Sequence, residues 1–219
     1  MGEEIDLMIN YPRSKRNVED RGEKKTDKDR ELARQFGEAF FDGHRDHGYG
    51  GFSYNSRFWE PVVPTFQSHF NLTSQDNVLD VGCAKGFMLY DFQRLIPGIG
   101  LAGIDISEYA ITRSMEAVKD LVQVGDAAEL PFDDNSFDVS ISVTTIHNLE
   151  LDLCGKALQE LERVSRRGSF VTLDAYRNDD EKARMESWNL TAKTMMHVDE
   201  WKKFFKEVGY TGDYYWFIP

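Results

Sequence analysis

The sequence predicts an α/β fold in which a doubly wound, mostly parallel sheet carries helices on both faces. Three observations support this prediction. From residue 77 onwards, short apolar runs typical of buried strands alternate with helical stretches. A glycine-containing turn follows the first of these strands. An acidic residue lies at the end of each of the first three strands, at the edge where open α/β sheets bind ligands.

The composition fits one such domain with an appendage. The chain has 219 residues and a net charge of −12, from 38 acidic and 26 basic residues. This balance argues against a phosphate-backbone partner, so no nucleic acid is expected. Two cysteines form neither a disulfide framework nor a zinc site. No apolar run reaches about 18 residues and the N-terminus is acidic, so we expect no membrane partner and a cytoplasmic protein, as a monomer or homodimer.

Residues 1–55 are predicted to form a region apart from a domain over residues 56–219. Residues 10–30 are charged and poor in apolar residues, which predicts a solvated arm. A helix over about 28–41, capped by Asp27, would follow. Residues 42–54 mix four glycines with aromatic residues and histidines, which is typical of a loop that covers a site. No metal is predicted there, because alternating Asp and His in a loop are more often simply polar; the residues weighed as ligands are Asp42, His44, Asp46 and His47.

The remaining elements follow from apolar periodicity and from breakers. A helix over about 55–70 is expected to be broken or kinked near Pro61 and Pro64. Strands are expected at 78–81, 101–104, 121–124, 137–144, 169–174 and 213–218, and helices at 86–96, 107–119, 153–166 and 198–208.

The glycine turn and the acids at the strand ends point to a ligand. The first strand contains Asp80, the chain turns through Gly82, and a helix opens after Gly86. Glycine lets the backbone approach a ligand, and a helix N-terminus offers free N–H groups. Alone, this pattern equally fits a packing turn. Asp105 follows about 20 residues on, where a ribose would be bound, and Asp126 ends the next strand. A single such Asp is more often a helix cap, but three in register favour a nucleotide-like ligand.

Three segments resemble class I S-adenosylmethionine-dependent methyltransferases of the small-molecule type: Val78-Leu-Asp-Val-Gly-Cys-Ala-Lys-Gly, Gly103-Ile-Asp-Ile-Ser, and Val124-Gly-Asp-Ala-Ala-Glu-Leu-Pro-Phe-Asp-Asp-Asn-Ser-Phe-Asp-Val. The similarity covers about residues 56–218. It implies a Rossmann-like fold and S-adenosyl-L-methionine as cofactor. It also implies that Asp80 and Gly82 lie near the methionine end, that Asp105 holds the ribose, and that Asp126 and Ala127 contact adenine. The full set of implied cofactor residues is Asp80, Gly82, Cys83, Ala84, Gly86, Asp105, Ile106, Asp126, Ala127 and Thr144.

The sequence departs from this family at two points. Ala84 stands where the family has the middle glycine of the turn. The usual last antiparallel strand is missing, because residues 213–218 correspond to the strand before it. Either the sheet is one strand short, or the N-terminal extension compensates.

The end of the strand at 137–144 would lie beside the reactive methyl group. No Asn/Asp-Pro-Pro-Tyr or Pro-Cys sequence occurs there, which argues against methylation of adenine or glutamine nitrogen and of cytosine C5. His147 and Asn148 follow instead. A hydroxyl acceptor must lose a proton during methyl transfer, and histidine has an ordinary pKa of about 6.5. His147 is therefore the predicted catalytic base; the alternative is a histidine that orients the loop or forms a hydrogen bond with the backbone. Asn148 is expected to position the acceptor.

Further acceptor contacts are predicted from two segments. Tyr49, Tyr54 and Arg57 belong to the glycine-rich loop and its continuation, while Tyr176 and Arg177 follow the strand at 169–174. An arginine there suits an anionic acceptor, or it pairs with the acids that follow it. The predicted function is methyl transfer to a small molecule at a hydroxyl oxygen, such as a sugar or secondary metabolite; the sequence does not separate O- from N-methylation. The alternatives are a tRNA or protein methyltransferase and a non-catalytic S-adenosylmethionine-binding protein.

Overall fold

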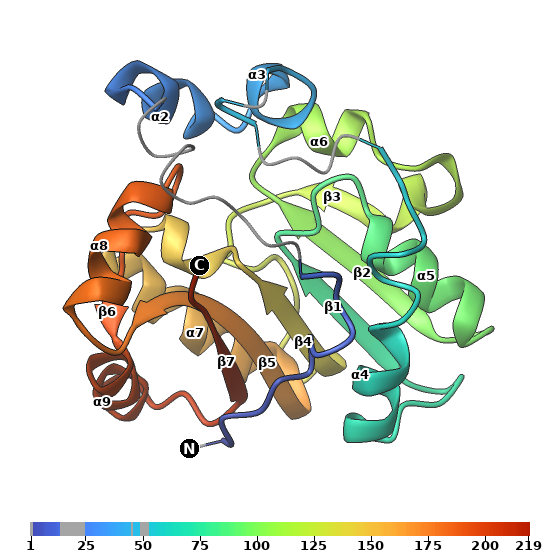
Figure 1. Cartoon of the computed structure of the whole chain (residues 1–219). Coiled ribbons are helices and arrows are strands. Elements are labelled where there is room, and N and C mark those ends of the chain that lie inside the picture. The colour runs from blue at the N-terminus through green and yellow to red at the C-terminus, as the bar shows by residue number, and fades with distance from the viewer. Residues whose placement is uncertain (1, 14–24, 45, 49–52) are drawn as a thin grey trace.

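The computed structural model describes residues 2–13, 25–44, 46–48 and 53–219, and it contains the predicted parallel sheet (Figure 1). The strand order is β3-β2-β1-β4-β5-β6, with β7 also paired to β5. Within the described residues, every pairing between these strands is parallel. The chain order reverses between β1 and β4, which places a ligand crevice at their carboxyl ends. The strands are β1 Asn77–Val81, β2 Gly100–Asp105, β3 Val122–Val124, β4 Phe137–Val143, β5 Ser165–Tyr176, β6 Met196–His197 and β7 Asp213–Phe217.

Helices cover both faces of the sheet because its central strands are apolar on both sides. Successive residues of β1 face opposite ways: Val78 packs in a core with Phe66 and Phe92, whereas Leu79 packs in a core with Leu161 and Trp201. The first face is covered by α4 Val63–Phe70 and α5 Phe87–Leu95. The second face is covered by α7 Leu151–Val164 and α9 Val198–Val208. The β2–β3 side of the sheet is covered by α6 Glu108–Thr112 and the 3₁₀ segment η1 Glu116–Leu121. No helix in the described part of the chain is long and apolar enough to cross a membrane.

The N-terminal segment completes the β7 side of the sheet. β7 lies directly against β5, where Phe170 pairs with Asp213. On the other edge of β7, the Ile5 N–H donates to the Tyr214 carbonyl at 3.0 Å, and the Tyr214 N–H donates to the Glu3 carbonyl at 3.0 Å. Among the described residues the strand pairings are all parallel, and the N-terminal extension adds the Glu4–Tyr214 bridge at the free edge of β7 (Figure 1).

Some helices differ from their predicted bounds. The helix predicted over 28–41 is two helices, α2 Asp27–Ala33 and α3 Glu38–Phe41, because Phe36 adopts a left-handed φ of 48° between them. Thr26, rather than Asp27, caps α2: its Oγ1 accepts the Asp29 N–H, and the Asp29 carboxylate accepts the Thr26 N–H.

Other elements are shorter than predicted or new. Of the helix predicted over 55–70, only α4 is helical, with Pro64 in its first turn. The predicted 107–119 helix is divided into α6 and η1, and a short 3₁₀ turn, η2 Ile146–Asn148, follows β4. Helix α8 Asp179–Trp188 has no counterpart among the predictions, because it buries only Met185 and so lacks an apolar periodicity. The separation of residues 1–55 from the rest stays a prediction, although Leu7 packs in the core of the sheet.

Candidate functional site

A cavity of about 1930 Å³ lies at the carboxyl ends of the strands, and α3 and the segment between α2 and α3 contribute to its wall. Pockets for one small ligand usually measure about 300–1,000 Å³, so this volume accommodates a donor and an acceptor. Gly86 does not line the cavity; it caps the N-terminus of α5 with φ 75°. All other predicted cofactor residues do line it: Asp80, Gly82, Cys83, Ala84, Asp105, Ile106, Asp126, Ala127 and Thr144.

The turn after β1 adopts a conformation that favours glycine. Gly82 has φ 87°, and a Cβ added there would lie 2.0 Å from the Oγ1 of Thr145. The N–H groups of Gly82 and Cys83 both donate to the Ile104 carbonyl, at 2.7 and 3.0 Å. Ala84 keeps the left-handed conformation of the missing glycine, with φ 49°. The turn therefore holds its shape against β2 and the end of β4.

Two buried carboxyl groups lie beside this turn. Asp105 accepts the Ala84 N–H through Oδ2 and the Ser107 N–H through Oδ1, both at 2.8 Å. Burial raises the pKa of Asp105, while these two donors act in the opposite direction. Burial, together with the charge of Asp105, raises the pKa of Asp80 to about 8. A cationic ligand would favour the ionised form of Asp80.

The neighbouring wall suits a flat apolar ring. Ile106 exposes 57% of its surface although it lines the cavity, and Ala127 lines the same cavity. The Asp126 Oδ1 accepts the Ala128 N–H at 2.8 Å, which fixes the turn after β3. Residues able to hold a ribose, an adenine-like ring and a cationic tail are thus gathered at adjoining strand ends, as S-adenosylmethionine requires.

Helices α2 and α3 are docked on the cofactor loops (Figure 1). Lys85 pairs with Asp42 at 2.5 Å, and the Tyr109 hydroxyl donates to the same carboxylate at 2.9 Å. The Ser107 hydroxyl donates to the Phe36 carbonyl. The apolar side of this contact contains Phe36, Phe40 and Phe41 against Ala84, Ala110 and Leu190. The N-terminal helices therefore form a cover over the turn.

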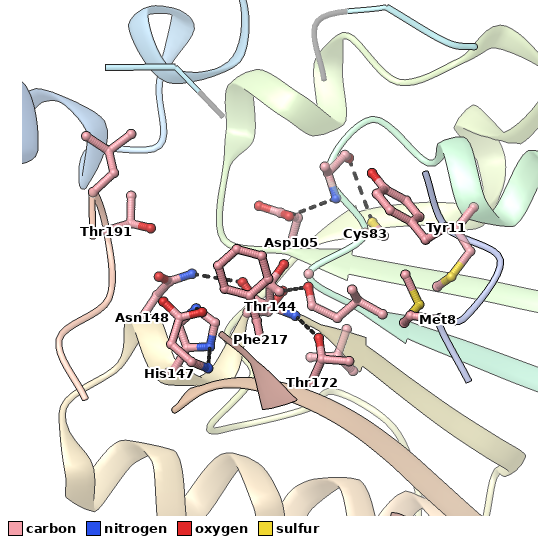
Figure 2. A pocket seen from close by; sticks show the side chains of 18 of the residues that line it. Met8, Tyr11, Cys83, Asp105, Thr144, His147, Asn148, Thr172, Thr191 and Phe217 are labelled. Atoms are coloured by element: carbon pink, nitrogen blue, oxygen red, sulfur yellow. Dashed lines mark hydrogen bonds and ion pairs between the residues drawn. The ribbon is translucent and has the colours of Figure 1, made fainter. Parts of the chain in front are cut away.

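The end of β4 faces the middle of the cavity. Thr144 has φ 50°, and its N–H is held by the Thr172 carbonyl at 3.1 Å and the Thr172 hydroxyl at 2.8 Å. The Asn148 Nδ2 donates to the Thr144 carbonyl at 3.4 Å, whereas its Oδ1 is buried and lacks a hydrogen-bond partner among the described residues. Figure 2 shows Thr144, His147 and Asn148 grouped beside Phe217. Asn148 lines the cavity, and its contact with an acceptor stays a prediction.

His147 is buried in the cavity wall and is paired with Asp174 at the end of β5. The Asp174 N–H donates to His147 Nδ1 at 3.0 Å, and His147 Nε2 lies 3.5 Å from the Asp174 Oδ1. Burial lowers the pKa of His147, and the Asp174 charge partly opposes this. The structure thus shows the hydrogen bond to backbone that was the alternative to a catalytic base; the base assignment itself stays a prediction.

The far wall of the cavity comes from the two ends of the described chain. Tyr11 packs its ring 5.4 Å from Phe58 and 5.2 Å from Trp59, measured between ring centroids. Met8 lines the same wall, and Phe217 reaches it from the end of β7 (Figure 2). The sequence predicted only a strand at 213–218 and a solvated arm over residues 10–30. The aromatic alternation of β7 was the available signal for Phe217; nothing local marked Met8 or Tyr11.

The predicted acceptor residues divide into three groups. Arg57 and Arg177 line the cavity, and Arg177 also lies 3.8 Å from Glu181. Tyr54 and Tyr176 do not line it. The Tyr54 hydroxyl donates to the buried carboxylate of Asp91 at 2.7 Å, and Tyr176 packs against His197 and Lys182. Tyr49 lies outside the described residues.

The described residues contain no group of three or more His, Cys, Asp or Glu side chains that could hold a metal ion. In the predicted loop, His44 lies 3.1 Å from Asp46 and His47 lies 3.7 Å from Asp29. These are separate pairs.

Comparison with known proteins connects this geometry to a family. A family model of a methyltransferase domain matches residues 79–173. A tRNA (carboxymethyluridine(34)-5-O)-methyltransferase of Arabidopsis thaliana is 31% identical over 146 residues, which is 65% of this chain and 33% of the relative. A demethylmenaquinone methyltransferase of Symbiobacterium thermophilum is 32% identical over 126 residues, covering 53% of this chain and 49% of the relative. The matches thus span about a third to a half of these relatives.

A solved structure shows the same fold. It comes from a complex of Haloferax volcanii between the Trm112 methyltransferase activator and a methyltransferase, with a TM-score of 0.55, 22% identity, and coverage of 69% of this chain and 68% of the other. The family match begins at Leu79 and ends at Leu173, so it contains the turn at Gly82, Asp105 and the strand ends on which the cavity opens. Residues 79–173 therefore match a methyltransferase domain, and they lie in the Rossmann-like fold of class I methyltransferases, for which S-adenosylmethionine is the methyl donor.

Proposed function

We propose that the protein transfers a methyl group from S-adenosylmethionine to a hydroxyl oxygen of a small-molecule acceptor. The donor supplies an electrophilic methyl group on a sulfonium. The chain holds the donor with the turn at Gly82 and with Asp105, covers it with α2 and α3, and aligns the acceptor at the end of β4.

One observation carries the choice of a small acceptor: the chain's own segments wall the space beyond the cofactor loops. Met8, Tyr11 and Phe217 line that space, together with Phe58 and Trp59. Aromatic walls bury the flat or apolar body of a ligand, and a few polar groups then orient it. Thr144 and Asn148 supply such groups. The similarity to a protein named for demethylmenaquinone supports an acceptor of this size.

A second candidate is an acceptor carried on tRNA, because the Arabidopsis relative is named for an O-methylation of a tRNA uridine. The net charge of −12 argues against it, since a phosphate backbone requires a basic surface. Residues 14–24, which are rich in basic side chains, lie outside the described part of the chain.

Labelled transfer separates these candidates. The purified protein is incubated with S-adenosylmethionine carrying a tritiated methyl group and, in parallel, with a small-molecule extract and with total tRNA. The proposal predicts label in the extract, in a product that resists mild base as an ether does. Label in tRNA alone would favour the second candidate. Binding of S-adenosylhomocysteine without transfer to either fraction, or to total protein, would indicate a non-catalytic binding protein.

A further inference from the structure

The buried pair of His147 and Asp174 lies where β4 and β5 end, and both residues line the cavity. Their side chains are 4% and 9% exposed. Asp174 was not among the predicted site residues. The imidazole of His147 and the carboxylate of Asp174 are two groups that could accept a proton from the acceptor. The hydrogen bonds of each side chain indicate which of the two is free to do so.

Both ring nitrogens of His147 lie close to Asp174, one to its backbone N–H and the other to its carboxylate. Nδ1 accepts the Asp174 N–H at 3.0 Å, so the proton of the neutral ring is on Nε2. Nε2 in turn faces the Asp174 carboxylate at 3.5 Å. A general base needs a free lone pair within reach of the proton that it removes. The only lone pair of the neutral ring already accepts a backbone N–H, so His147 has none left for an acceptor (Figure 2).

In Asp174, by contrast, the hydrogen bonds to other described residues involve the backbone and not the carboxylate. Its backbone is fixed, because its N–H donates to His147 and its carbonyl accepts the Trp201 Nε1–H at 3.0 Å. Asp174 lines the cavity, and the His147 ring lies beside its carboxylate. Burial raises the pKa of Asp174, and His147 partly opposes this. A raised pKa makes a carboxylate a stronger base near neutral pH.

We propose that Asp174 is the catalytic base that takes the acceptor's hydroxyl proton, and that His147 is a positioning residue that orients and stabilises the Asp174 carboxylate. The inference rests on the proposed function. In the transfer, an oxygen–carbon bond forms to the acceptor and the carbon–sulfur bond of the donor breaks, with its electron pair left on sulfur. The hydroxyl proton moves to Asp174, which releases it to solvent before the next turnover.

The first test compares Asp174→Asn with the wild-type protein. Asparagine keeps the size of the side chain and both backbone hydrogen bonds, so the fold is retained. We expect methyl transfer into the small-molecule extract to fall by about 10²–10⁴-fold, the usual contribution of general base catalysis. The Kd for S-adenosylhomocysteine, measured by calorimetry, should stay within about threefold of wild type, because the cofactor residues are unchanged.

The second test addresses His147 through pH. His147→Asn retains an oxygen in place of Nδ1 to accept the Asp174 N–H, but removes the Nε2–H that faces the carboxylate. The transfer rate should rise with pH as Asp174 ionises, and this variant should shift the midpoint upward, since His147 lowers the pKa of Asp174. The control is His69→Asn: His69 pairs with Asp213 at 2.7 Å outside the cavity, so the midpoint should not move.

A readout without turnover uses the carboxyl ¹³C resonance of Asp174, assigned by its loss in Asp174→Asn. It should titrate above the ordinary Asp range of about 3.9, and higher still in His147→Asn. Titration in the ordinary range, or transfer by Asp174→Asn at the wild-type rate, overturns the inference. Failure of the proposed function looks different, because the wild-type protein would then label nothing in the extract.

Discussion

The two halves of the cavity are assembled in different ways. The proposed donor half consists of Asp80, Gly82, Asp105 and Asp126, which lie at or just after the ends of three consecutive strands and line the cavity. The proposed acceptor half consists of Met8, Tyr11, Trp59, Asp174 and Phe217, which come from both ends of the described chain, from the segment before α4 and from β5. Local sequence therefore determines the donor half, whereas only the packing of distant segments creates the acceptor half. Substitutions should separate the two halves experimentally.

The largest expected effect is in the donor half, from Gly82→Ala. A Cβ there would lie 2.0 Å from the Oγ1 of Thr145, and φ is 87°, so the turn must move. We expect the Kd for S-adenosylhomocysteine to increase at least 100-fold, an effect of about 2.7 kcal/mol, by calorimetry. Gly209→Ala is the matched control: φ is 77°, but nothing lies within 4 Å of its Cβ. It should lower stability without weakening cofactor binding; equal binding by both variants would contradict the role of the turn.

The next effect is in the acceptor half, from Tyr11→Ala. This variant removes a ring packed on Phe58 and Trp59, so KM for the acceptor in the labelled extract should increase about tenfold or more. The Kd for S-adenosylhomocysteine should not change. Tyr54→Phe serves as the comparison, because Tyr54 contacts Asp91 outside the cavity. It should lower the free energy of unfolding by about 1.5–3 kcal/mol while leaving KM unaltered. A similar KM for the wild type, Tyr11→Ala and Tyr54→Phe would refute the proposal that Tyr11 belongs to the wall that binds the acceptor.

A smaller effect is expected from pH on the donor half. With the pKa of Asp80 raised to about 8, the free protein holds this carboxyl largely protonated at pH 7. Binding of the cationic donor favours the ionised form, so affinity for S-adenosylmethionine should increase from pH 6 to 8, by at most about tenfold per pH unit. S-adenosylhomocysteine lacks the sulfonium charge, so its affinity should depend less on pH. In Asp80→Asn the pH dependence of S-adenosylmethionine affinity should disappear. A flat pH profile for S-adenosylmethionine would contradict this coupling.

The same group affects folding with a defined sign. Because the folded-state pKa of Asp80 lies above the ordinary Asp value of 3.8, its contribution to stability is complete at low pH and is lost as pH rises toward 8. Thermal unfolding of the free protein should therefore show a loss of stability between pH 5 and 8 that Asp80→Asn reduces.

The smallest effect is expected from Ala84→Gly. Ala84 has φ 49°, a conformation that strains alanine but not glycine. The greater flexibility of glycine in the unfolded chain offsets part of the gain. We expect the free energy of unfolding to increase by about 0.5 kcal/mol in a denaturant titration, with cofactor binding retained. A loss of stability would show that the alanine methyl packs favourably against the cover helices.

The sequence predicted the sheet, and it placed the residues of the proposed donor half at the strand ends where the cavity lies, because both depend on local patterns. Apolar runs mark the strands, and Gly82 and Asp105 follow them at fixed intervals. The acceptor half was largely missed for a physical reason: Tyr11 lies in a charged stretch, and it reaches the cavity only because residues 3–5 pair with β7. Tyr54 was expected at the acceptor, but the buried carboxylate of Asp91 holds its hydroxyl elsewhere. Asp174 ends a strand whose burial, not its sequence, gives the carboxyl its altered pKa.

Calorimetric titration of the wild-type protein with S-adenosylhomocysteine at pH 8 tests the central claim most directly, because it requires no knowledge of the acceptor. The donor half, with Gly82 and Asp105 in place, predicts a single site with a Kd in the micromolar range, an affinity of about −8 kcal/mol. The absence of binding at up to about millimolar ligand would contradict the account, because the family's donor site would then not function in this chain.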